Sequence, residues 1–168
     1  MDPRVTIRPE RAGDATAIRS IHEASFPSAA EADLVDALRR SGHLSVSLVA
    51  CDGEAVVGHI GFSPVSVLQG PPGLGLAPLA VTPAYRRHGV ASRLVRDGLA
   101  ECRVRAASWV VVLGDPAVYG SLGFTAASDF GLSDEYGGGP AFQVLELTEQ
   151  GAPRGAGTVR YGPEFSAL

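Results

Sequence analysis

The expected fold rests on one turn, Val81-Thr82-Pro83-Ala84-Tyr85-Arg86-Arg87-His88-Gly89-Val90-Ala91-Ser92. Before it, Leu76 to Val81 has the composition of a strand. After it, Val90 to Arg105 carries its apolar residues on one face of a helix. The next apolar run, Trp109 to Leu113, predicts a buried strand. Strand, helix and strand in this order predict a parallel pair joined by a right-handed crossover.

The turn also has the composition of an anion-binding site. Gly89 removes side-chain bulk where an anion would approach the backbone, and the free amides that begin the helix add positive potential. Arg86 and Arg87 add fork-shaped cationic donors. A phosphate or pyrophosphate would suit this place, and a solvated turn without a ligand is the alternative. A Rossmann site is disfavoured, because this turn comes late in the chain and has one glycine.

The remaining pattern predicts a mixed α/β sheet in one domain. Further strands are expected at Val5 to Pro9, Leu44 to Ala50, Ala55 to Phe62 and Ala141 to Leu147. Asp52-Gly53 is a hairpin signal, so part of the sheet is antiparallel. Two early helices are expected, one from Asp14 and one from Ser28, where Ser28 and Glu31 stand at capping-box spacing. We expect one domain over residues 1–168, with a less patterned tail from about residue 149.

Two prolines indicate local features of the sheet and of a short helix. Pro78 lies within the strand-like run that ends at Val81, and proline cannot donate to a ladder, so this strand should lose pairing on one side there. Asp115-Pro116 is typical of a helix N-cap followed by proline at the first helical position. A short helix through Val118 to Leu122 should follow.

Composition excludes several chemistries. The 14 basic residues are all arginine, and the chain has neither lysine nor asparagine. Without lysine there is no Schiff-base enzyme and no ordinary phosphate-loop NTPase. Without asparagine there is no Cys-His-Asn site. The net charge of -4 argues against nucleic acid as a partner, although Arg86, Arg87, Arg93 and Arg96 keep that alternative open.

The chain is expected to be cytoplasmic. Met1-Asp2-Pro3-Arg4 lacks the apolar segment of a secretory signal. No run reaches the ~18 apolar residues of a membrane span. Cys51 and Cys102 make no disulfide framework and should pack as small hydrophobic residues. No His/Cys/Asp cluster has metal-ligand spacing, so no metal is expected.

Several of these motifs resemble the GCN5-related N-acetyltransferases (GNAT). Arg86-x-x-Gly89-x-Ala91 is similar to that family's acyl-CoA signature, Q/R-x-x-G-x-G/A. Tyr119-Gly120-Ser121-Leu122-Gly123-Phe124 matches its Y-x-x-x-G-F element. Val112 to Pro116 and Ala141 to Val144 are similar to a YhbS-like bacterial branch. The resemblance covers roughly residues 4 to 148.

The resemblance implies the fold, the co-substrate and the site. It implies a mixed sheet of about six to seven strands and about four helices, in which two parallel strands splay around the pantetheine arm of acetyl-CoA. Backbone groups of Leu79, Ala80 and Val81 would bind that arm and polarise the thioester. The pyrophosphate would be held by Arg86, Arg87, His88, Gly89, Val90, Ala91 and Ser92. Tyr119 would donate a proton to the leaving thiolate, while Phe124 is expected in the core.

The implied activity is transfer of an acetyl group to a primary amine by direct attack. The amine could belong to a small molecule or to a protein N-terminus, and a homodimer is possible. Many relatives carry an asparagine ahead of the tyrosine, where this chain has Gly114-Asp115-Pro116. No general base stands out among Glu31, Asp33, His22, His59 and Asp115. For these reasons a non-catalytic acyl-CoA-binding module is the alternative function.

Overall fold

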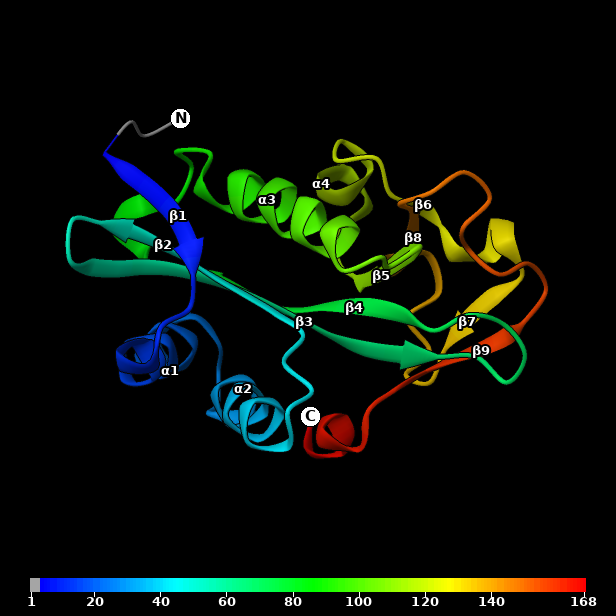
Figure 1. Cartoon of the computed structure of the whole chain (residues 1–168), viewed down its shortest axis with the longest axis horizontal. Helices are drawn as coiled ribbons and strands as arrows, with labels where there is room; N and C mark the ends of the chain where they lie inside the picture. Colours follow the sequence, from blue (N-terminus) through cyan, green and yellow to red (C-terminus); the bar gives the residue numbers. More distant parts are fainter. Residues whose placement is uncertain (1–3) are drawn as a thin grey trace.

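A long mixed sheet forms the centre of this computed structural model, which describes residues 4–168 (Figure 1). Its main path runs β1-β2-β3-β4-β5-β8-β6, while β9 pairs with β3 and β7. The strands are β1 Val5–Pro9, β2 Val46–Asp52, β3 Ala55–Ser66, β4 Gly73–Val81, β5 Trp109–Leu113, β6 Thr125–Ala126, β7 Leu132–Asp134, β8 Phe142–Glu146 and β9 Gly157–Tyr161. The expected mixed sheet is confirmed, and β7 and β9 extend it. The Met1-Asp2-Pro3-Arg4 segment, which was expected to lack a secretory signal, lies mostly outside the described residues, because these begin at Arg4.

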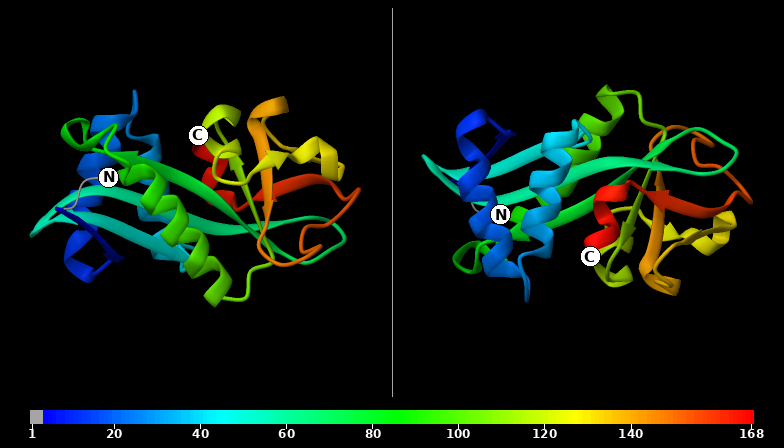
Figure 2. Two further views of the ribbon diagram at one scale, coloured as in Figure 1. Left: turned by 90° about the horizontal axis from the view of Figure 1, so that it is seen from above. Right: turned by 90° about the horizontal axis from the view of Figure 1, so that it is seen from below.

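Helices cover both faces of the sheet (Figures 1 and 2). They are α1 Ala15–Ser25, α2 Ala30–Ser41, α3 Val90–Val104 and α4 Pro116–Gly120. The first two helices lie on one face, and α3 lies on the other. Val90, Leu94, Val95, Leu99 and Cys102 are buried, which confirms the expected apolar face of α3. Within residues 4–168, no helix combines the length and the apolar character needed to cross a bilayer.

The pairing of β4 with β5 is short. The two strands are parallel, as expected, and pair at Leu74–Val110, Gly75–Val111 and Leu76–Val112. Beyond Leu76, β4 continues to Val81 and pairs with β3 as far as Val81–Gly58. The sheet is therefore open on one side of β4 from Pro78 onward, which confirms the expected splay.

The ends of the helices follow local chemistry, with one correction. Gly42 ends α2 in the left-handed conformation, at φ 79°, and Asp115 caps α4 by accepting from the Ala117 amide at 2.9 Å. The Ser28–Glu31 capping box is wrong. The Ser28 hydroxyl accepts from the Ala30 amide at 3.2 Å, in a turn that precedes the helix. The N-cap is therefore Ala29, and the Glu31 side chain is not used as a cap.

The glycine-rich tail is more ordered than its sequence pattern indicates. It forms β9 and a 3-10 helix, η5 Pro163–Ala167, which packs beside α2 (Figure 1). Phe165 is buried with Leu34 and Leu38 of α2. Val159 of β9 is buried in a second cluster with Trp109. The tail thus completes the hydrophobic packing on the α2 face of the sheet.

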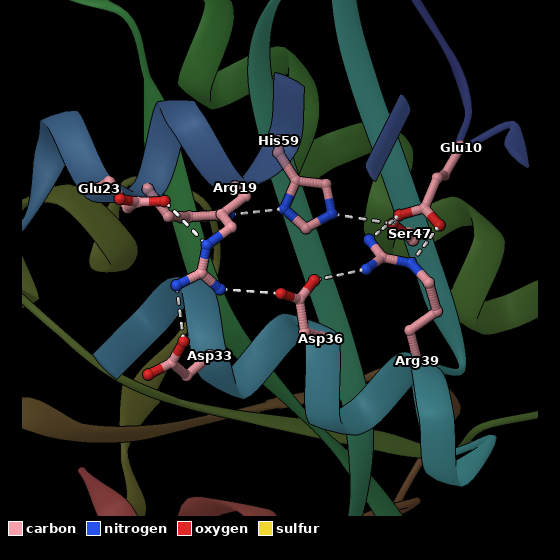
Figure 3. A network of polar contacts seen from close by, with 9 residues as sticks. Glu10, Arg19, Glu23, Asp33, Asp36, Arg39, Ser47 and His59 are labelled. Carbon is pink, nitrogen blue, oxygen red and sulfur yellow. Dashed lines mark hydrogen bonds and ion pairs between the residues drawn. The ribbon is translucent and has the colours of Figure 1, made fainter. Parts of the chain in front are cut away.

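A chain of polar contacts crosses the interface between α1, α2 and the sheet (Figure 3). His22 Nε2 lies 2.8 Å from His59 Nδ1, and His59 Nε2 lies 2.8 Å from the Ser47 hydroxyl. That hydroxyl donates to Glu10, which also holds Arg39 in a two-point ion pair. Burial favours the neutral form of both imidazoles, and with neutral rings this order of donors places a proton on each Nε2. His22 Nδ1 is then a buried acceptor with no partner among the described residues.

Burial makes these two histidines sensitive to acid. Desolvation lowers the pKa of His22 to about 4. Burial lowers the pKa of His59 well below its usual value, and the positive charges of protonated His22 and of Arg39 lower it further. An unfolded histidine binds a proton near pH 6.5, so between that pH and about 4 the unfolded state binds more protons. Stability must rise with pH across this window and fall as the pH is lowered.

We predict that the free energy of unfolding decreases from pH 6.5 to pH 4 by ~1.4 kcal/mol per pH unit for each histidine involved. Urea unfolding at stepped pH measures this slope. His22→Gln should reduce it, because one buried imidazole is removed. His88→Gln, which changes an exposed histidine, is the matched control and should retain it. If the free energy of unfolding had the same pH slope in His22→Gln and in the wild type, the lowered pKa of buried His22 would be contradicted.

Candidate active site

A cavity of about 530 Å³ lies where β4 and β5 part. Strand residues from Leu76 to Leu79 and Val112 to Leu113 form one wall. The opposite wall comes from the α1–α2 region, α4 and the tail, through Phe26, Glu31, Leu34, Tyr119, Tyr136, Tyr161, Phe165 and Leu168. The cavity is therefore assembled by segments from both ends of the chain around the opening in the sheet.

The peptide groups of β4 alternate between the neighbouring strand and this opening. The Thr82 amide donates to Val57 of β3 at 2.8 Å. Because successive peptide groups of a strand point to opposite sides, the peptide groups of Ala80 also point to β3. Those of Leu79 and Val81 point to the side from which β5 has diverged. Of the three predicted backbone positions, Leu79 and Val81 therefore present their peptide groups to the opening, whereas the peptide groups of Ala80 point to β3.

A smaller hollow of about 320 Å³ continues from the cavity toward the turn. The two share Phe26 and Leu79, and the hollow is also lined by Ser25, Ala80, Val81, Arg86 and Ala91. Five of the ten predicted co-substrate residues thus meet in one hollow. Of the others, Arg87, His88 and Gly89 lie exposed on the turn, Ser92 is half-buried, and Val90 is buried in the core.

The turn has the backbone shape of an anion site. Gly89 is the N-cap of α3 and has φ 80°, and Arg87 also adopts a left-handed conformation, at φ 64°. No side chain caps this helix. The amides from Val90 to Ser92 lie in the first turn of α3, where a helix offers its N–H groups no intrahelical partner. Together with the helix dipole they form a positive concavity of the kind that binds phosphate.

Arg86 is held by its own chain at the rim of the hollow. Its Nε donates to the Val81 carbonyl at 2.8 Å, and its Nη2 donates to the Ser25 hydroxyl at 3.3 Å. The guanidinium thereby joins the end of β4 to the end of α1. Arg86 fixes the geometry of the turn, besides bringing a positive charge to it.

Tyr119 lies in the wall of the larger cavity, on α4. Its ring packs edge-on against Phe124, with centroids 5.7 Å apart, and Phe124 is buried as expected. Burial raises the pKa of the Tyr119 phenol. The hydroxyl therefore keeps its proton at neutral pH and is available as a donor.

In the turn ahead of Tyr119, which has no asparagine, Gly114 leaves the space that the Tyr119 ring occupies. A Cβ atom at Gly114 would lie 2.4 Å from the Tyr119 ring, so any side chain there would displace the ring. Asp115 is engaged as the cap of α4. The Gly114-Asp115-Pro116 turn therefore seats the tyrosine and does not itself offer an amide side chain.

The structure separates the five candidate bases. Glu31 lines the cavity that contains Tyr119. Asp33 is ion-paired with Arg19 at 2.8 Å, and Asp115 caps α4. His22 and His59 are buried against one another and line neither the cavity nor the hollow. Of the five, Glu31 and no other is a lining residue of the cavity that contains Tyr119.

Three aromatic residues are among the cavity residues that were not predicted from the sequence. Tyr136, Tyr161 and Phe165 come from the weakly patterned last third of the chain and form consecutive ring contacts at 5.9 and 4.8 Å. The alternation Thr158-Val159-Arg160-Tyr161 is a strand signal that could have revealed β9. Its contact with the cavity depends on long-range packing, which no local signal encodes.

Metal ligands and thiols play no visible part in the site. Over residues 4–168, no group of three or more His, Cys, Asp and Glu side chains could hold a metal ion. Cys51 and Cys102 are free and buried, and burial raises the pKa of the Cys102 thiol to about 12. The expected packing of the two cysteines as small hydrophobic residues is confirmed.

Comparison with known proteins agrees with this geometry. Residues 15–124 match the model of the Acetyltransferase (GNAT) family. The N-acetyltransferase YhbS of Escherichia coli K12 is 42% identical over 164 residues, which are 95% of this chain and 98% of YhbS.

Two solved structures share the whole fold. The crystal structure of Escherichia coli YhbS in complex with CoA has a TM-score of 0.91 at 42% identity, covering 98% of this chain and 94% of that one. A GNAT acetyltransferase from Brucella melitensis in complex with acetyl-CoA has a TM-score of 0.80 at 35% identity, covering 96% and 98%. With the family signature at the turn, the open strand pair and the tyrosine in place, the chain belongs to the GNAT family of N-acetyltransferases.

Proposed function

We propose that this enzyme transfers an acetyl group from acetyl-CoA to a primary amine. The observation that carries the proposal is the continuous path from the positive turn, along the open side of β4, to the cavity that holds Tyr119. Relatives that contain CoA or acetyl-CoA support the choice of donor. The acceptor could be a small-molecule amine or a protein N-terminus. The homodimer and the cytoplasmic location remain predictions.

The residues of the path fit acetyl-CoA. The amides of Val90 to Ser92 and the positive-φ backbone at Gly89 would bind the pyrophosphate. The peptide groups of Leu79 and Val81 would bind the amides of the pantetheine arm, as an added strand would. The Val81 carbonyl already accepts from Arg86, so the Val81 amide is the group that we assign to the ligand.

Acetyl-CoA supplies a thioester at which the neutral amine nitrogen forms an amide as the carbon–sulfur bond breaks, so that the nitrogen loses one proton and the sulfur gains one. Tyr119 Oη would donate its own proton to the sulfur, and the proton that a base takes from the nitrogen would return to the Tyr119 oxygen through solvent. Its raised pKa suits this role, because the phenol stays protonated until the thiolate leaves. The edge contact with Phe124 and the close fit against Gly114 hold the ring in one orientation.

Glu31 would accept the proton from the attacking amine. Glu31 belongs to the first turn of α2 and is one of the residues that line the cavity. A carboxylate there also attracts the ammonium form of the acceptor before it is deprotonated. Acid and base would thus line one cavity, which lets both act on the same bound amine.

We predict that Gly89→Ala weakens acetyl-CoA binding. Alanine in a left-handed conformation costs about 1–2 kcal/mol, so the turn should relax and the affinity measured by calorimetry should fall about tenfold. Gly42→Ala is the matched control, because Gly42 has φ 79° and open space around it but lies at the end of α2. Both variants should lose stability. Equal affinities in the two variants would contradict the phosphate-binding role of the turn.

We predict that Tyr119→Phe lowers kcat for thiol release from acetyl-CoA about 100-fold. The affinity for acetyl-CoA should change little, because the hydroxyl acts on the leaving sulfur. Gly114→Ala should also lower kcat, since its methyl group would displace the Tyr119 ring. Timed assays that detect free CoA with a thiol reagent measure kcat, and calorimetry measures the affinity for acetyl-CoA.

The control for Gly114→Ala is Gly120→Ala, where an added Cβ meets no atom within 4 Å. This variant should keep wild-type turnover. Unchanged turnover in Tyr119→Phe would remove Tyr119 from the acid role. Acetyl-CoA binding without thiol release from any amine would favour the non-catalytic alternative.

A further inference from the structure

The wall of the cavity that faces away from the strands is the part available to the acceptor amine. The strand wall, from Leu76 to Leu79, borders the path that we assign to the co-substrate. The far wall is made by α2, the loop at Tyr136 and the C-terminal segment. In Figure 2 the C-terminal helix η5 lies beside α2 on the same face of the sheet. This far wall is therefore the surface left for the amine.

Among the described residues that line the cavity, Glu31 is the one with a charged side chain. Of its lining residues within the described chain, Glu31 carries a carboxylate and none carries a basic group. The other lining side chains are aliphatic or aromatic. The lining thus offers one carboxylate side chain to a cation. A second ammonium group placed against the aromatic lining would be desolvated there without a side-chain partner, at a cost of several kcal/mol.

Aromatic rings dominate the far wall. Three of the four tyrosines of the chain, Tyr119, Tyr136 and Tyr161, line the cavity together with Phe26 and Phe165. The rings of Tyr136, Tyr161 and Phe165 contact one another in sequence. Such a cluster gives apolar contact area to a flat body and electron-rich faces to a cation.

We infer that the acceptor is a primary amine with a single positive charge on an apolar, preferably aromatic, body. The ammonium group would face Glu31, and the body would lie against Tyr136, Tyr161 and Phe165. This inference rests on the proposed function and names its substrate class. A free arylalkylamine and a protein N-terminus that begins with a large apolar residue share this chemistry.

The cavity argues against two other classes of amine. Polyamines carry several charges along a flexible chain, and aminoglycosides carry several charges on a hydroxylated body. Each would need further carboxylates or hydrogen-bonding side chains on the far wall. The far wall supplies Glu31 and the tyrosine hydroxyls as its polar side-chain groups. Tyr136 is half exposed, at 49%, and stands at the outer end of the ring cluster, which makes it the residue most able to select the body of the amine.

The test compares amines at saturating acetyl-CoA by their rates of thiol release. The panel contains ethylamine, 2-phenylethylamine, spermidine, kanamycin and a tetrapeptide with a free N-terminal phenylalanine. We expect kcat/KM for 2-phenylethylamine to exceed that for ethylamine by at least ~10–200-fold, the range for a single methylene in an apolar pocket. The tetrapeptide arm distinguishes a free amine from a protein N-terminus as the source.

Two variants connect this preference to the far wall. Tyr136→Ala should reduce the preference for 2-phenylethylamine over ethylamine about tenfold, through KM and with little change in kcat, because it removes contact with the body. Leu68→Ala, at an exposed loop residue that does not line the cavity, should leave the preference unchanged.

The outcomes separate this inference from the proposed function. Highest kcat/KM for spermidine or kanamycin, or an unchanged preference in Tyr136→Ala, would overturn the inference while the transferase activity stands. Retained acetyl-CoA binding without thiol release from any member of the panel would overturn the proposed function, and the inference with it. A higher kcat/KM for either aromatic arm than for ethylamine, reduced in Tyr136→Ala, supports it.

Discussion

The limited pairing of β4 with β5 is the constraint on which the site depends. The parallel ladder holds from Leu74 to Leu76, and then Pro78 interrupts the row of donors that would continue it. One side of β4 stays open while β3 still pairs with the other. A strand in the interior of a sheet thereby gains an exposed edge, which proteins usually avoid or cover. We propose that acetyl-CoA covers it.

The other parts of the site are arranged around that opening. Arg86 bonds the last carbonyl of β4 to the turn, so the strand edge and the start of α3 are fixed relative to each other. At the other end, Gly114 lets the Tyr119 ring approach the end of β5. The tail then closes the far wall with Tyr161 and Phe165. Phosphate binding, acid catalysis and acceptor selection are thus assigned to three separate segments that meet along one strand.

The parts predictable from the sequence are those encoded by local chemistry. The apolar face of α3, the cap at Asp115, the left-handed end of α2 at Gly42 and the break at Pro78 each follow from neighbouring residues. The capping role expected for Ser28 was wrong because a serine hydroxyl can accept either from a helix N–H as a cap or from the amide two residues later in a turn. In this structure it accepts from the Ala30 amide, in a turn. Tyr136, Tyr161 and Phe165 could not be predicted, since their role comes from packing across the fold. For the same reason Glu31 was one of five candidate bases until the cavity distinguished it.

We assign the surface that receives acetyl-CoA to the peptide groups of Leu79 and Val81. Residue-resolved amide hydrogen exchange, measured with and without acetyl-CoA, tests it most directly. Without ligand, the amides of Leu79 and Val81 should exchange faster than that of Ala80, which points to β3. Acetyl-CoA should slow exchange at Leu79 and Val81 and leave Ala80 nearly unchanged. Equal protection of all three amides before the ligand is added, or ligand protection that bypasses Leu79 and Val81, would contradict the account.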